Sequence, residues 1–184
     1  MPKLLGISKV LLYALTVAEF ASMLIKINIE ASFSQVDAIQ EIIPTYMKLN
    51  YGFTILSSIV IWIVLCLLFH LVALLFDGER KFSDLLNASS YIYIIPAIAI
   101  FVSILLLKQI DMSKVIDIDE FVNSSKDIKL ISAIVNYSFF PFYVLAGLIV
   151  HYLYDIKWIK SFLCVVIPVI GIWGTSTLVK FMYS

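Results

Sequence analysis

The feature that most constrains this chain is the run of residues 53–76, which contains no Asp, Glu, Lys or Arg. A helix needs about 20 consecutive apolar residues to cross the hydrocarbon core of a bilayer. This run therefore predicts a transmembrane helix. A second uncharged run, residues 85–107, follows after a short charged turn. The two runs together predict a hairpin of two helices that cross a membrane in opposite directions.

The same pattern extends over the rest of the chain. Of its 184 residues, 62% are hydrophobic and 14% are charged, and the mean hydropathy is +1.02. A soluble domain is nearer half apolar and a quarter charged. We predict an all-α, polytopic integral membrane bundle that forms a single domain over residues 1–184. The expected spans are residues 4–29, 53–76, 85–107, 130–154 and 161–179, with longer loops at residues 30–52 and 108–129.

The first apolar block is unusually polar, because Lys9, Glu19 and Lys26 interrupt it. A cleaved signal peptide is a competing interpretation, but no clean A-x-A cleavage site follows the apolar core. On a helix the three charged residues share one flank. We therefore expect that flank to face other helices or the membrane interface.

Glu19 is the most unusual single residue of the sequence. A charge in the middle of a span costs about 2.5–3.5 kcal/mol on insertion scales, so it is a functional candidate by default. It could carry a proton or bind a cation. The structural interpretation, which we favour, pairs Glu19 with Lys26 or Asn136, because the chain has no series of further intramembrane acids.

The two longer loops leave alternatives open. Apolar residues recur with helical spacing from Phe33 to Met47, which fits either a short amphipathic helix on the membrane surface or a plain loop. Pro44 is expected to bend or end such a helix. The loop at 108–129 is the most hydrophilic part of the chain and is either a contact surface outside the membrane or a solvated connector.

The basic residues of the short loops predict the orientation. Arg80, Lys81, Lys157 and Lys160 fall in short turns between expected spans, and short loops rich in Lys and Arg stay on the cytoplasmic side. With five spans, this rule predicts a cytoplasmic N-terminus and an external C-terminus.

The sequence contains few candidates for a catalytic or metal-binding site. His70 and His151 lie near the same membrane face as Asp77 and Asp155, so a metal site is conceivable, although polar caps for helix ends are the preferred interpretation. The sequence has no H-E-x-x-H motif, no phosphate-binding loop and no serine with an evident partnering base. We predict a protein that is not an enzyme, with no catalytic residue, metal or cofactor. The net charge of +0 implies no nucleic-acid partner.

The hairpin also carries a resemblance. Its pattern is an apolar span that ends in histidine, a basic turn with a glycine, and then a Phe, a Leu pair, a Tyr and a Pro. The residues are His70, Gly78, Lys81, Phe82, Leu85, Leu86, Tyr91 and Pro96. This pattern resembles the bacterial branch of the Yip (Ypt-interacting protein) family. A later stretch is similar to the fourth and fifth spans of that family, through Leu145, Gly147, Leu148, His151, Lys160 and Pro168. The chain departs from the family in having one glycine in the turn, where two or three are common, and in its polar first span.

The resemblance implies five transmembrane helices, a cytosolic N-terminus and no enzymatic activity. Bacterial relatives look like accessory membrane proteins, some of them associated with ABC-type exporters or with resistance to toxins and antimicrobial peptides. We therefore expect a bacterial plasma-membrane protein whose partners are the lipid bilayer and other membrane proteins or further copies of itself. The alternative is a small transporter or channel with a path lined by Glu19 and Asn136. The candidate functional or packing positions are Glu19, His70, Gly78, Phe82, Tyr91, Pro96, Asn136 and His151.

Overall fold

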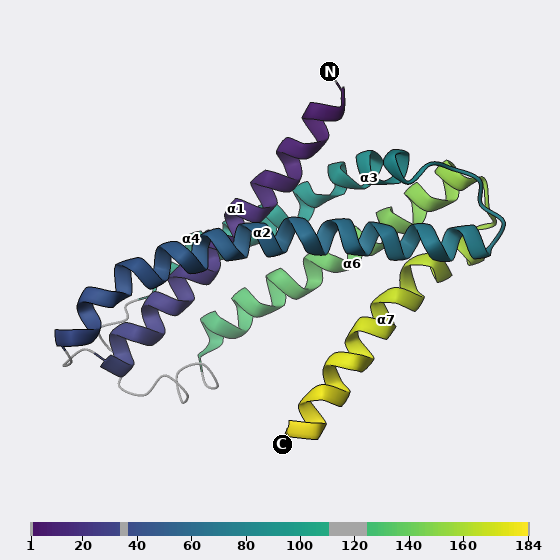
Figure 1. Ribbon diagram of the computed structural model, residues 1–184. Coiled ribbons are helices and arrows are strands. Elements are labelled where there is room, and N and C mark those ends of the chain that lie inside the picture. Colours follow the sequence, from purple (N-terminus) through teal and green to yellow (C-terminus); the bar gives the residue numbers. More distant parts are fainter. Residues whose placement is uncertain (1, 34–36, 111–124, 184) are drawn as a thin grey trace.

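The computed structural model describes residues 2–33, 37–110 and 125–183, and every regular element within these ranges is helical (Figure 1). Five segments of the described chain are long and apolar enough to cross a membrane. They are Gly6–Ile27, Ile42–Leu75, Phe82–Leu107, Lys126–Tyr154 and Trp158–Thr175. The prediction of an all-α fold with five potential spans is confirmed. These spans indicate a multi-pass membrane protein, and the orientation of the N-terminus stays a prediction.

The first two helices, α1 (Pro2–Phe33) and α2 (Asp37–Leu75), pack along one another. Most of the predicted linker at 30–52 is therefore helical, and the plain-loop interpretation is wrong. Pro44 lies inside α2 and does not end it. Proline removes one backbone hydrogen bond, and a helix of 39 residues that packs on a neighbour continues past that loss.

The second half of the hairpin is a broken helix made of α3 (Phe82–Ser90), the 3₁₀ turn η1 (Tyr91–Tyr93) and α4 (Ile94–Leu107). The break lies just before Pro96, which has no N–H to donate to the carbonyl four residues earlier, that of Ile92 in η1. Pro96 is buried, so the irregular turn is enclosed by other helices rather than exposed to lipid.

The last two helices are α6 (Lys126–Tyr154) and α7 (Trp158–Tyr183). The helix α6 begins four residues before the predicted span, because Ser125 caps it by accepting a hydrogen bond from the Ile128 amide at 3.4 Å. Most of the predicted 108–129 loop lies outside the described residues. The helix α7 starts beside the end of α6 and diverges from α2 and α6 towards its own C-terminus (Figure 1).

The core of the bundle lies between α1, α2, α6 and the broken helix. Trp62 of α2 is buried there, and its indole Nε1 donates a hydrogen bond to the Ser89 hydroxyl at 3.1 Å. The Tyr93 and Phe142 rings meet edge to face, with centroids 4.9 Å apart. These contacts hold α2 and α6 against the broken helix.

Candidate functional site

The turn after α2 has the geometry of a Schellman motif. Asp77 adopts a left-handed conformation (φ 67°), and the amides of Asp77 and Gly78 donate hydrogen bonds to the carbonyls of Leu74 and Ala73 at 3.2 and 3.0 Å. A Cβ at position 78 would lie 2.8 Å from Tyr154 Cδ1 and 2.9 Å from the Ala73 carbonyl oxygen. The predicted turn glycine is thus required by close packing rather than by its own dihedral angles.

Three of the predicted positions, Gly78, His70 and Phe82, lie at Tyr154 or next to its partner His70. Its ring lies against Gly78, its hydroxyl pairs with His70 Nδ1, and Phe82 packs on the His70 ring with centroids 5.5 Å apart. Only 4% of Tyr154 is exposed. The sequence analysis did not single out Tyr154, although its place as the last residue of the fourth span was a usable signal.

The turn between α6 and α7 is held in a similar way. Asp155 adopts a left-handed conformation (φ 52°), and His151 Nδ1–H donates to the Ile156 carbonyl at 2.6 Å. The His151 ring stacks on Trp158, with centroids 4.2 Å apart and planes at 27°. His151 therefore closes the turn that joins two neighbouring spans.

Basic side chains join these two turns to each other. Arg80 Nε donates to the Leu153 carbonyl at 2.8 Å, which satisfies a backbone group at the end of α6. Lys160 Nζ lies 3.9 Å from the Asp77 carboxylate. The Asp77 side chain is 95% exposed, so this ion pair adds little to stability. The two turns form one hydrogen-bonded end of the bundle, which we call the turn cluster (Figure 1).

The conceivable metal site of His70, Asp77, His151 and Asp155 is not assembled. Within the described parts of the chain, no three His, Cys, Asp or Glu side chains come close enough to share a metal ion. His70 instead pairs with Tyr154 of α6, and His151 donates to the Ile156 carbonyl of its own turn. This arrangement indicates that His70 and His151 stabilise the turns at this end of the bundle.

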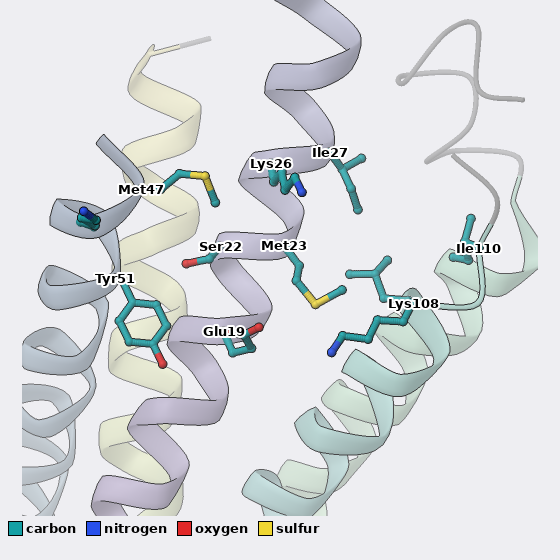
Figure 2. A pocket seen from close by; sticks show the side chains of 11 residues that line it. Glu19, Ser22, Met23, Lys26, Ile27, Met47, Tyr51, Lys108 and Ile110 are labelled. Carbon is teal, nitrogen blue, oxygen red and sulfur yellow. The ribbon is translucent and has the colours of Figure 1, made fainter. Parts of the chain in front are cut away.

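Glu19 lies at the opposite end of the bundle, in a cavity of about 580 Å³ between α1, α2 and α4 (Figure 2). The cavity combines charged, hydroxyl and apolar side chains. Its lining residues are Glu19, Ser22, Met23, Lys26, Ile27, Met47, Lys48, Tyr51, Leu107, Lys108 and Ile110. We call it the lysine cavity.

The position of the lysine cavity changes the interpretation of Glu19. Lys48 and Tyr51 also line it, and they lie just before the uncharged run of α2. Lys108, which lines it as well, lies just after the last residue of α4. Glu19 is therefore level with the ends of neighbouring spans, not with their middles, because α1 continues beyond the end of α4. Among the described residues, Glu19 forms neither predicted pair, with Lys26 or with Asn136.

The remaining predicted positions lie elsewhere. Asn136 is exposed on α6, where its amide donates to Ser132 of the same helix at 3.2 Å, and it does not line the lysine cavity. The structure thus does not join Glu19 and Asn136 in that cavity. The Tyr91 ring carries the Lys9 amino group 4.0 Å from its centroid, a cation–π contact that joins α1 to η1.

A third feature is an apolar groove of about 680 Å³ between α1, α2, α6 and α7. Aromatic and branched side chains line most of it, together with Ser57 and Ser58 of α2 and with Ile172 and Trp173 of α7. Gly171 and Gly174 of α7 do not line it, because they lie on the side of the helix that faces away from the groove. Among the described residues, a Cβ at either glycine would have no atom within 4 Å. We call this feature the α7 groove, and the sequence analysis did not predict it.

Comparisons of the chain with models of protein families, with curated proteins and with solved structures found no match.

Proposed function

We propose that this chain is a non-enzymatic, multi-pass protein of the plasma membrane that acts by binding another membrane protein through helix–helix contacts. The observation that carries the proposal is the open α7 groove. The more specific role, which rests on the resemblance to the Yip family, is that of an accessory to an ABC-type exporter or of an immunity factor against a toxin or antimicrobial peptide.

The physical argument begins with what small residues do in membranes. Lipid tails are as apolar as leucine side chains, so helices associate through close packing, and glycine allows that packing. Gly147 shows this use within the chain, since a Cβ there would lie 2.8 Å from the Phe162 ring. Gly171 and Gly174 have the same potential on another face of α7, where no described atom lies within 4 Å of a Cβ at either position.

The shape of α7 supports the same conclusion. Because α7 diverges from α2 and α6, the side chains of Ile172 and Trp173 border an open groove, and 71% of Trp173 is exposed (Figure 1). A transmembrane helix from a partner protein would fill this groove and lie against Ile172 and Trp173 of α7. Such a partner supplies the close contact that this chain does not make for itself.

Copurification from native membranes tests the proposal. Wild-type protein should recover a membrane partner in a fixed ratio, and Ser57→Phe should abolish recovery, because the larger side chain fills the groove that Ser57 lines. Gly52→Phe is the matched control, since position 52 also lies on α2 but outside the groove, and no described atom lies within 4 Å of a Cβ there. Recovery of wild-type protein with lipid alone would refute the proposal, as would equal loss in the Gly52 control.

A further inference from the structure

We infer that the lysine cavity binds the headgroup of an aminophospholipid, with its phosphodiester among the lysines and its primary ammonium at Glu19. This ligand site is separate from the α7 groove and from the turn cluster.

The charges of the cavity match a zwitterionic ligand. Lys48 and Lys108 bring two cationic groups to its wall, and Glu19 brings one carboxylate. Among described residues, neither Lys48 nor Lys108 forms an ion pair with Glu19. Figure 2 shows the Lys108 side chain extending from α4 towards α1, so opposite charges face one space without neutralising each other. A phosphate between lysines and an ammonium at the carboxylate would satisfy both signs.

A buried hydroxyl gives a second and independent indication. Only 9% of Ser22 is exposed, and its Oγ has no hydrogen-bond partner among the described residues. A serine or threonine in a helix usually donates to a carbonyl one turn earlier, as Thr16 does to Tyr13 at 2.8 Å. An unsatisfied buried polar group costs about 1–3 kcal/mol. Ser22 lines the cavity, and its hydroxyl points from α1 towards the α2 side (Figure 2), where a ligand oxygen would accept its hydrogen bond.

The apolar part of the wall favours a lipid over a soluble phosphate. Met23, Ile27, Met47, Leu107 and Ile110 line the cavity beside the charged groups. A phospholipid presents a headgroup next to acyl chains, and this cavity presents a polar wall next to apolar spans. Its volume of about 580 Å³ lies within the range of about 300–1,000 Å³ that is common for small-molecule sites.

Glu19 supplies the selectivity for a primary amine. A carboxylate accepts hydrogen bonds from the N–H groups of an ethanolamine headgroup, whereas the quaternary ammonium of a choline headgroup has no N–H to donate. A glycerol headgroup has no cation for Glu19. The preferred ligand is therefore phosphatidylethanolamine, and phosphatidylcholine and phosphatidylglycerol with the same acyl chains are its matched comparisons.

Native mass spectrometry of the full-length protein in detergent tests the site, with the three lipids titrated separately. We expect saturable binding of phosphatidylethanolamine at least about tenfold tighter than of phosphatidylcholine. Lys48→Gln with Lys108→Gln should weaken that binding about tenfold, and Glu19→Gln should remove the preference while lipid still binds. Lys129→Gln, which changes a lysine of α6 outside the cavity, should leave binding unchanged.

The following outcomes of this experiment would overturn the inference. Equal binding of the three lipids, or no saturable binding, would remove the site. A loss of the same size with Lys129→Gln would show a general effect of charge. Binding of water-soluble glycerophosphoethanolamine as tightly as the lipid would replace the lipid with a soluble phosphoamine. Ser22→Ala provides a variant without charge change, and we expect it to weaken lipid binding without lowering the yield of folded protein.

Discussion

Gly78→Ala should destabilise the protein, because the new methyl group would enter a space that is already filled. Its Cβ would lie 2.8 Å from Tyr154 Cδ1 and 2.9 Å from the carbonyl oxygen of Ala73. The second contact is with backbone, so it cannot be relieved by a side-chain rotation. Overpacking of this kind costs about 1–3 kcal/mol.

The same substitution should have the opposite sign at Gly52. This glycine lies inside α2, and a Cβ there would have no atom within 4 Å. Alanine in a helix interior is more stable than glycine by about 1 kcal/mol. The two alanine variants should therefore differ by about 2–4 kcal/mol, which corresponds to a separation in Tm on the order of 10 °C for a chain of this size.

Thermal unfolding in detergent, followed by tryptophan fluorescence, measures this difference. We expect the Tm of Gly78→Ala to fall below the wild-type value and that of Gly52→Ala to rise above it. Equal midpoints for the two variants would refute the assignment of Gly78 to a packed turn and, with it, the geometry of the turn cluster.

Three further substitutions test neighbouring contacts in the same unfolding assay. Tyr154→Phe should lower stability by about 1–2 kcal/mol, because it removes the hydroxyl that pairs with His70 and keeps the ring; an unchanged midpoint would argue against that pair. Trp62→Phe should cost about 2 kcal/mol or more, through the lost hydrogen bond to Ser89 and the smaller ring; a neutral result would place the indole outside the core. Lys160→Gln should leave the midpoint unchanged, since its ion-pair partner is 95% exposed, and a large decrease would show that the two turns depend on this pair.

The spans could be predicted from the sequence because length and apolar composition are local properties. The uncharged residues 53–76 and 85–107 required helices whatever else the chain did. Pro44 does not end the helix, and the sequence does not show the packing of α1 on α2 that accompanies this continuation. The packing of α1 on α2 outweighs the loss of one backbone hydrogen bond at Pro44.

The environment of single side chains depends on tertiary structure, so it was less predictable. Glu19 falls in the middle of an apolar block of sequence, but α1 extends beyond the end of α4 and places Glu19 beside Lys108. The partners of His70 and Gly78 are on a helix more than 70 residues away, at Tyr154. The spacing of residues in either segment does not predict these contacts with Tyr154.

Photo-crosslinking in native membranes tests the central proposal most directly. A photoreactive residue at Ile172, in the α7 groove, should form one discrete adduct with another membrane protein, whereas the same residue at Phe101, on the exposed face of α4, should react with lipid. Lipid adducts alone at both positions would contradict the proposal. An adduct with a second copy of the chain would also contradict it and would assign the groove to self-association.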